Sequence, residues 1–461
     1  MANQQMLGTE SIGKLLLKYS VPAIIGMIVN ALYNVVDRIF IGNIPDVGAL
    51  AITGVGVTMP IMTIILAFGM LIGVGATANI SIKLGQGKKE DAETIIGNTI
   101  TLSVIISLVI SVVGILFGDS ILKIFGASDA TLHYAKSYIY IILGGTLFNI
   151  IAFTLNNTIR GDGNPKLAAL IMVVGCLTNI VLDALLIFKF NMGIKGAAIA
   201  TVTSQMVTAI WALMYYIRGK SNLKFRKSSL KLDKSLVKLI FAIGSAPFAM
   251  QISASLVQVI SNNALKAYGG DLAIGAMATV SSISMIFLMP VFGINQGAQP
   301  IIGFNYGAKK YDRANKTFKI SAVVASIIMA IGWILIQVKP EFIVGMFNKD
   351  PKLMDITING AKIYLLMLPI IGISITGSNY MQSVGKAKSA MILSLLRQVI
   401  LLIPMIMILP KFFGLNGVWY AQPVSDFLST VITVAVLLKE LGRYKTDNTE
   451  EEVELKTEFQ S

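Results

Sequence analysis

Long runs of apolar residues with almost no charge recur from one end of this 461-residue chain to the other. A helix of about 20 apolar residues crosses a bilayer, because lipid offers no hydrogen-bond partner and a helix satisfies its own backbone. Only 13% of the residues are charged, about half the usual share of a soluble domain. We therefore expect an all-α polytopic membrane protein with twelve spans. They lie at about 15–41, 50–80, 92–117, 131–157, 166–188, 196–217, 236–266, 272–304, 314–338, 355–383, 388–410 and 415–438.

The cations of the chain gather in alternate loops. The segment 218–234 alone carries seven Lys and Arg residues, and the other loops that follow even-numbered spans are also basic. The remaining loops are poorer in cations, although Lys189 and Lys195 are exceptions and Asp46 lies in one of them. Positive loops stay on the cytoplasmic side, so we expect a multi-pass protein of the cytoplasmic membrane with both termini inside. The net charge of +14 has the same origin, and nucleic acid is not an expected partner.

The chain also repeats itself. The stretch "IKLGQGKKEDA" aligns with "IGFNYGAKKYDRA" and "RGDGNPKLA" aligns with "QSVGKAKSA", which places Gly85 over Gly307 and Gly163 over Gly385 at an offset of 222 residues. Each half then holds six spans in the same orientation, so the pseudo-two-fold axis lies along the membrane normal and substrate binds between the halves.

This repeat predicts the domain organisation of the chain. The expected parts are an N-terminal bundle of six helices at 1–217, a cytoplasmic basic linker at 218–234, a C-terminal bundle at 235–440 and a polar tail at 441–461. The tail is rich in acids, and we expect it to be cytoplasmic and disordered. We expect the chain to function as a monomer.

Ionisable residues within the spans are rare and are usually functional. Asp37 near the end of span 1 shares a helix face with Asn34, and Asp183 near the end of span 5 shares one with Asn179. Spans 1 and 5 run in the same direction, so the two carboxyl groups lie at similar depth. Two acids close together in a low-dielectric site cannot both stay ionised cheaply, so one is protonated or a cation binds between them. The sequence predicts a coupling site for H⁺ or Na⁺, with a possible Na⁺ at Asp37, Asn179 and Asp183.

The second half of the chain carries a different pair. Arg397 in span 11 and Asp426 in span 12 lie near mid-depth on adjacent helices, which favours an intramembrane ion pair. The pair could hold the bundle together, or it could take part in gating or substrate binding. No catalytic motif occurs in the chain, so we expect neither an enzyme nor a cofactor beyond the coupling ion.

Five motifs together resemble the multidrug and toxic compound extrusion (MATE) family, in its MepA-like bacterial branch. They are "SVPAIIGMIVNALYNVVDRIFIG", "LGQGKKEDA", "RGDGNPKLA", "TNIVLDALLIF" and "GIKGAAIATVTSQ", and the resemblance covers about residues 10–440. It implies a V-shaped pair of bundles, alternating access, and export of organic, mainly cationic, small molecules in exchange for H⁺ or Na⁺. It also implies a polar cluster of Tyr33, Asp37, Asn179, Asp183 and Thr201.

One departure from the family pattern concerns a second cation site in spans 7 and 10. Span 7 offers Gln251 and no acid, and span 10 has no acid either, so we expect coupling to rest on the first half. The candidates for the substrate cavity are Tyr33, Asn34, Gln251, Arg397 and Asp426. The alternative function is a flippase for a lipid-linked precursor, which would need an Arg- and Lys-lined cavity. A membrane enzyme and a channel fit the sequence less well.

Overall fold

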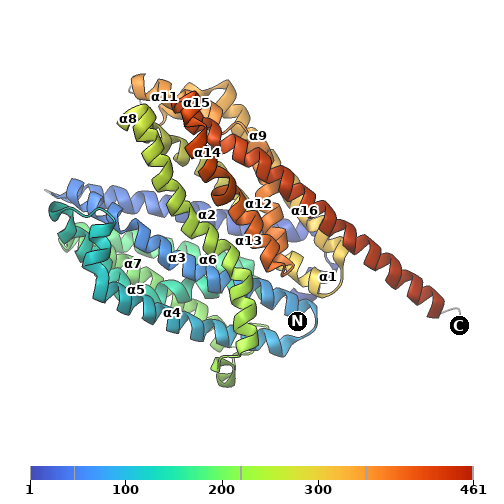
Figure 1. Ribbon diagram of the computed structural model, residues 1–461. Helices are drawn as coiled ribbons and strands as arrows, with labels where there is room; N and C mark the ends of the chain where they lie inside the picture. The colour runs from blue at the N-terminus through green and yellow to red at the C-terminus, as the bar shows by residue number, and fades with distance from the viewer. Residues whose placement is uncertain (1, 46, 219–220, 348–350, 459–461) are drawn as a thin grey trace.

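The structure is a computed structural model, and it describes residues 2–45, 47–218, 221–347 and 351–458. Asp46 and Lys220 lie outside the described residues. The described chain is helical almost throughout and contains no strand. Figure 1 shows the helices gathered in two bundles, one formed by α2–α7 and the other by α8–α16. We call these bundles the N-lobe and the C-lobe.

The helices of the N-lobe and the segment before it come first in the chain. They are α1 (Ala2–Thr9), α2 (Ile12–Gly42), α3 (Gly48–Gly85), α4 (Lys89–Ile124), α5 (Asp129–Gly161), α6 (Pro165–Asp183), the π-helix η1 (Ala184–Lys189) and α7 (Gly193–Ile217). The linker contains a short 3₁₀ turn, η2 (Lys227–Leu230).

The C-lobe is more broken. Its helices are α8 (Lys234–Gly307), α9 (Tyr311–Val338), α10 (Pro340–Gly345), α11 (Pro351–Tyr364), α12 (Leu368–Ser383), α13 (Ala387–Leu395), the π-helix η3 (Leu396–Leu402), α14 (Ile403–Ile408), α15 (Pro410–Phe413) and α16 (Leu415–Glu458). The helix α8 holds two spans, which join at Gly270, where φ is +68°. Such a backbone angle suits glycine, which has no Cβ.

The number of membrane spans agrees with the sequence. Among the described residues, eleven helices are long and apolar enough to cross a bilayer, and the bent pair of α11 and α12 makes the twelfth span. The bend between these two helices is 54°. It falls just before Pro369, whose missing N–H prevents a regular helix from continuing through this point.

Two spans contain π-helices that the sequence analysis did not predict. In span 5, η1 follows directly after Asp183, and in span 11, η3 begins just before Arg397. Pro404 comes two residues after η3 ends and has no N–H to donate to the preceding turn, which loosens the regular pattern there. π-helices are often found at functional sites because the extra residue turns side chains to new directions.

The first turns of one helix from each lobe pack in the hydrophobic core of the other lobe. Leu15 and Tyr19, at the start of α2, pack in a cluster with residues of the C-lobe. In return, Leu236 and Ile240, at the start of α8, pack in the main cluster of the N-lobe. The exchange is reciprocal because spans 1 and 7 occupy equivalent places in the repeat.

The lobes meet at one end and diverge toward the other (Figure 1). One close approach is between Gly85, at the end of α3, and Gly307, at the end of α8. A Cβ on Gly85 would lie 2.0 Å from the Phe304 carbonyl oxygen, and one on Gly307 would lie 2.1 Å from that of Ile82. The contact is therefore reciprocal about the pseudo-two-fold axis. Only glycine permits this approach of two backbones.

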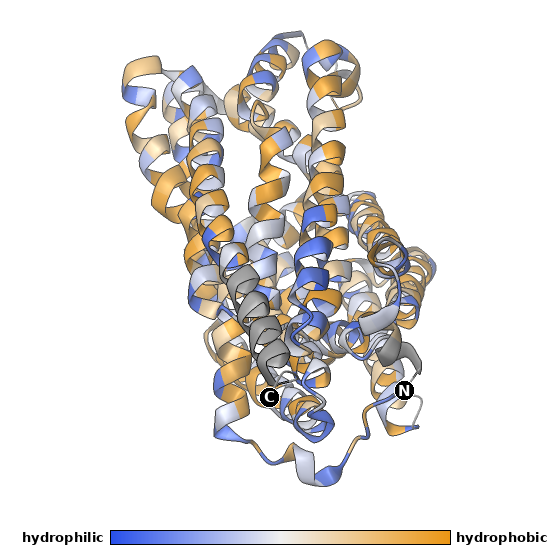
Figure 2. Cartoon of the chain, turned by 90° about the vertical axis from the view of Figure 1, so that its right-hand side faces the viewer, coloured by the Kyte–Doolittle hydropathy of each residue, from blue (hydrophilic) through white to orange (hydrophobic). Residues whose placement is uncertain are grey.

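The helix α16 differs from its prediction at its end. The tail was expected to be disordered, but α16 continues as a helix to Glu458. Figure 1 shows this extension projecting away from the lobes. Figure 2 shows that hydrophobic residues predominate along the lengths of the helices, as a lipid-embedded surface requires.

Candidate functional site

Asp37 and Asp183 come together inside the N-lobe. Asp37 lies on α2 and Asp183 is the last residue of α6, and both are buried. Their carboxyl groups face each other at hydrogen-bonding range. Neither acid forms an ion pair with a described residue, and the adjacent Arg38 instead turns its guanidinium toward the sulfur of Met59 on α3. The site is therefore a buried pair of acids that forms no ion pair with a described residue, although Arg38 lies close enough to act on Asp37 electrostatically.

Asn179 contacts the acid pair, and Thr201 in turn holds the Asn179 amide. The Asn179 amide satisfies both of its groups when its nitrogen faces Asp183. It then donates to Asp183 Oδ2 at 2.7 Å, and its oxygen accepts from the Thr201 backbone N–H at 3.1 Å. Thr201 lies on α7, so this amide links α6 to α7 at the acid pair.

The electrostatics of the pair follow from its burial. The Oδ1 atoms of Asp37 and Asp183 accept no hydrogen bond from the described residues. Two adjacent carboxylates in a low-dielectric site repel each other, so the doubly ionised state is unfavourable. The arrangement can hold one shared proton, or a small cation that two carboxylate oxygens coordinate.

Two tyrosines complete the cluster. Tyr33, one turn before Asp37 on α2, and Tyr138, on α5, both lie against the Thr201 hydroxyl. Sequence reasoning missed Tyr138, which is buried and lies within electrostatic range of both acids. It occurs in the ordinary apolar stretch "SYIYIILGG", so no charge or spacing in the sequence singled it out.

The polar stripe predicted on span 1 is divided in the structure. Asp37 is buried in the cluster, whereas Asn34 is exposed and donates its amide to the Asn30 carbonyl oxygen at 2.7 Å. At 100° per residue, Asn34 is about 60° around the helix from Asp37, which places it beyond the edge of the packed face. Gln251 is half-buried on the first half of α8, in the other lobe from the acid pair.

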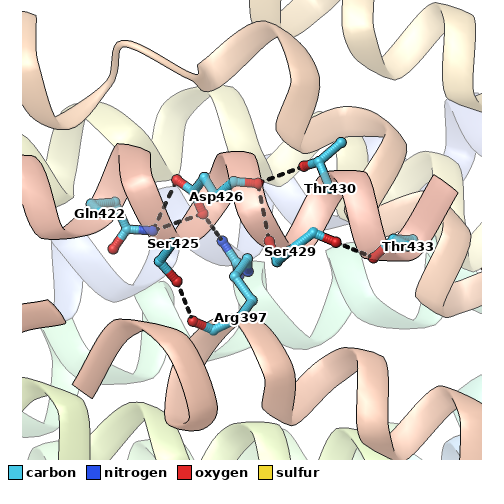
Figure 3. Close-up of polar contacts among 7 residues, drawn as sticks. All are labelled: Arg397, Gln422, Ser425, Asp426, Ser429, Thr430 and Thr433. Carbon is cyan, nitrogen blue, oxygen red and sulfur yellow. Dashed lines mark hydrogen bonds and ion pairs between the residues drawn. The ribbon is translucent and has the colours of Figure 1, made fainter. Parts of the chain in front are cut away.

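The C-lobe holds the ion pair that the sequence suggested (Figure 3). Arg397 Nη1 lies 3.5 Å from Asp426 Oδ1, with Asp426 fully buried and the Arg397 side chain 17% exposed. The Gln422 amide nitrogen donates to both Asp426 oxygens at 3.0 Å. The Ser425 hydroxyl donates to the Arg397 carbonyl oxygen at 2.7 Å and so joins α16 to η3. Here the acid is matched by a base.

The described residues offer no group of three or more His, Cys, Asp or Glu side chains that could hold a metal ion. The oxygens of the cluster are those of the two carboxyl groups, the Thr201 hydroxyl and the hydroxyl groups of Tyr33 and Tyr138. The Asn179 oxygen already accepts the Thr201 N–H in the orientation described above.

A sequence model of the MatE family matches this chain twice, at residues 22–185 and 247–408. The two matches begin at equivalent places in the two halves, which confirms the internal repeat. Curated relatives match over nearly their full length. The multidrug export protein MepA of Staphylococcus haemolyticus (strain JCSC1435) is 27% identical over 97% of this chain and 98% of its own. The protein of the same name from Staphylococcus aureus (strain MRSA252) is 25% identical over 95% and 96%.

Solved structures agree with this result. The MATE multidrug transporter DinF-BH, solved in complex with a ligand, is 39% identical and superimposes with a TM-score of 0.87 over 94% of this chain and 96% of its own. An outward-facing MATE transporter of the MOP superfamily superimposes with a TM-score of 0.91 over 96% and 99%. At 22% identity it supports the fold alone. The chain is thus a polytopic membrane protein that belongs to the MATE family of multidrug efflux transporters.

Proposed function

We propose that the chain is a secondary antiporter that exports organic cations from the cell in exchange for H⁺. The observation that carries the proposal is the buried pair of Asp37 and Asp183, which forms no ion pair with a described residue. Protonation removes the charge repulsion of the pair, and proton release restores it. The two states differ by a full charge inside the protein, so they favour different packing of α2 against α6.

The choice of H⁺ over Na⁺ rests on the Asn179 amide. Its N–H group donates to Asp183 Oδ2, and a donor directed at the site opposes a cation bound to that same oxygen. A proton shared by two carboxyl groups needs no further ligand. Na⁺ would have to compete with the Asn179 N–H group for the Asp183 oxygen.

The driving force is sufficient for export. Exchange of one monovalent organic cation for one H⁺ moves no net charge, so the pH gradient drives it with about 1.4 kcal/mol per pH unit. Each further proton that crosses 100 mV adds about 2.3 kcal/mol. That energy is used by alternating access, in which the lobes open to one side at a time around a shared cavity. The close contact of Gly85 and Gly307 shuts the end that carries the basic loops, so we assign this conformation as open to the outside. We assign the loops at the closed end to the cytoplasm, together with both termini.

The flippase alternative gains no support from the cavity candidates. It would need a basic cavity, and Arg397 is the one basic residue among them, already facing Asp426. The matched relatives carry the names of multidrug exporters. We propose that a single chain suffices for transport.

The direct test uses proteoliposomes that contain the purified chain and a lipophilic cation such as tetraphenylphosphonium. A pH gradient alone should drive its movement against its own gradient, and a Na⁺ gradient alone should not. Transport driven by Na⁺ alone would move the proposal to a Na⁺ antiporter. Failure under both gradients, with protein correctly inserted, would contradict antiport altogether.

The orientation has its own test. Cys176 is the one cysteine of the chain and is buried, so a Cys176→Ser background can carry a single new cysteine at Lys227 in the linker. We expect a membrane-impermeant maleimide to label this cysteine in inside-out vesicles and not in intact cells. Labelling from outside intact cells would reverse the assignment of the two faces.

A further inference from the structure

The linker between the lobes is an ordered strap, which we define as residues 221–233. Its beginning is fixed by Asp162, at the end of α5. The buried Asp162 carboxylate accepts hydrogen bonds from the Tyr215 hydroxyl at 2.5 Å and from the Ser221 hydroxyl at 2.7 Å. The Asn222 backbone N–H donates to the same oxygen at 3.2 Å. These bonds attach the strap to the N-lobe.

The rest of the strap is fixed along the first turns of α4. Asn98 donates to the carbonyl oxygens of Ser229 at 3.1 Å and Lys231 at 3.2 Å, and accepts from the Asp233 N–H at 2.8 Å. Thr101 donates to the Leu230 carbonyl oxygen at 2.8 Å. Because these contacts all go to the N-lobe, the strap has a fixed height on α4.

That height coincides with the edge of the lipid-facing surface. The exposed apolar residues of α4 begin at Ile105 and run to Phe117, before the half-exposed Asp119. At 1.5 Å per residue this stretch covers about 18 Å, which fits within the hydrocarbon core of about 30 Å. Thr101 is one turn before Ile105, so Leu230 lies at the boundary between acyl chains and headgroups. Leu230 and Leu232 are 36% and 39% exposed there.

The exposed side chains of the strap and the first turn of α8 are mainly cationic. Five exposed lysines have no ion pair with a described residue, and they are Lys224, Lys227, Lys231, Lys234 and Lys238. Arg226 differs because it pairs with the buried Glu93 at 3.2 Å.

The acids near the lysines do not balance them. Glu90 is exposed and lies 4.0 Å from Arg226. Asp233 caps α8, and the hydroxyl of Ser235 with two backbone N–H groups holds its pKa below the usual range. Its charge therefore faces the helix end, and the lysines keep a net positive surface beside two exposed leucines.

We propose that this strap is a binding surface for the headgroups of anionic phospholipids in the adjacent leaflet, with Leu230 and Leu232 inserted among the upper acyl carbons. Cations at an anionic membrane surface each strengthen binding by about fivefold. Apolar side chains at the same level hold the cations close to the phosphates. The occupant is a lipid rather than a soluble anion because two exposed leucines lie among the exposed lysines of the same short segment. Figure 2 shows hydrophilic and hydrophobic residues alternating in the linker at the lower edge of the molecule.

The test compares the full-length protein with a variant that replaces four strap lysines, K224Q/K227Q/K231Q/K234Q. A matched control, K88Q/K89Q/K316Q/K388Q, removes four lysines from the same predicted face outside the strap. Each protein is titrated with phosphatidylglycerol in mixed micelles. Bound lipid is counted by native mass spectrometry, and the thermal midpoint is measured in parallel. A charge-retaining variant with four arginines at the strap positions shows whether the segment still folds.

We expect phosphatidylglycerol to bind and to raise the thermal midpoint of the unmodified protein, the control and the arginine variant. The glutamine variant should bind it at least about tenfold more weakly. Equal binding by the glutamine variant would overturn the proposal, and so would equal loss in the control, which would indicate a diffuse charge effect. A rise of the same size with soluble glycerol phosphate would overturn it as well, because the surface would then select an anion and not a lipid. None of these results depends on transport.

Discussion

The two lobes are built from the same repeat, yet they place opposite electrostatics in it. The N-lobe buries two acids together that form no ion pair with a described residue, whereas the C-lobe buries one acid beside one arginine. The acid pair of the N-lobe can carry one negative charge or two, and binding or release of a single proton converts one state into the other. The ion pair of the C-lobe has no net charge, and neutralising either Arg397 or Asp426 leaves the other charge without its partner. We propose that the N-lobe changes its charge state during transport while the C-lobe keeps its own.

The scaffold behind the two sites is nevertheless shared. Asp183 directly precedes η1 in span 5, and Arg397 is the second residue of η3 in span 11. Thr201 and Gln422 occupy equivalent places in the aligned stretches "GIKGAAIAT" and "GLNGVWYAQ", and each lies beside the buried acid of its lobe. The repeat therefore supplies the equivalent positions of Thr201 and Gln422, whereas Asp183 and Arg397 lie at different places in their spans.

The largest effect should follow from Asp183→Asn. Asparagine keeps the shape of the side chain but cannot exchange a proton, so efflux driven by a pH gradient should fall to the level of protein-free liposomes. Asp37→Asn should reduce efflux in the same way. Thermal midpoints should not fall in either variant, because each removes one of two repelling charges. Transport and melting are measured on the same preparations.

The control for these variants is Asp119→Asn. Asp119 is half exposed and pairs with Lys136 at 2.5 Å, so its neutralisation should leave transport unchanged. If Asp183→Asn exports at the rate of the unmodified protein under the same gradient, the coupling site is not in the N-lobe. The comparison between the lobes would then have to be reversed.

The next largest effect should follow from breaking the C-lobe pair. Arg397→Gln leaves the fully buried Asp426 without its base, and such a loss costs about 3 kcal/mol in folding stability. Asp426→Asn should cost less, because Arg397 is partly exposed and can reach water. We expect lower thermal midpoints for both, in contrast to the N-lobe variants.

The double variant Arg397→Gln/Asp426→Asn decides whether the pair acts as a unit. It should recover part of the stability that each single variant loses, since no charge is left uncompensated. A double variant whose loss equals the sum of the single losses would show that the two side chains act independently. Full stability with lost export would instead assign Arg397 to the substrate pathway.

Most of the architecture followed from the sequence, because the signals for it are large and local. Long apolar runs predicted the twelve spans, and two matching loops predicted the repeat. The depth and direction of spans predicted that Asp37 would lie near Asp183 and Arg397 near Asp426, since a bilayer fixes the height of each residue. Helical periodicity alone placed Asn34 on the same helix face as Asp37. In the structure Asp37 is buried and Asn34 is exposed, because the packed face of α2 is narrower than the predicted polar stripe.

The features that could not be predicted depend on contacts between distant segments. Tyr138 joins the acid pair from α5, and nothing in its own neighbourhood distinguishes it from other tyrosines in spans. The π-helix η3 lies just before Pro404, whereas η1 has no proline nearby, so no local signal in the sequence marks it. The end of α16 was expected to be disordered from its composition, although the structure continues the helix.

A smaller effect should follow from Gln422→Ala. This amide donates to both oxygens of Asp426, and a hydrogen bond to a buried charge contributes about 2 kcal/mol. The thermal midpoint should fall by less than in Arg397→Gln. Gln422→Glu is the sharper companion, because it places a second acid beside Asp426 and so imitates the N-lobe. A variant with glutamate that is as stable as the unmodified protein would show that the C-lobe tolerates an acid pair, and the contrast between the lobes would weaken.

The smallest effect should follow from Thr201→Ala, the counterpart of that change in the N-lobe. The Asn179 oxygen accepts from the backbone N–H of residue 201, which alanine keeps, and in this orientation the same oxygen lies 3.4 Å from the Thr201 hydroxyl, which is a long contact. Loss of the hydroxyl should therefore cost about 0.5 kcal/mol, or about a twofold change in efflux driven by a pH gradient. A hydroxyl that coordinated Na⁺ would behave differently, because its loss removes a direct ligand from the site. Efflux is measured for this variant with pH and Na⁺ gradients imposed separately. A severe loss of efflux that added Na⁺ reverses would show that the acid pair binds a metal cation. The N-lobe would then couple transport through Na⁺ coordination and not through a shared proton.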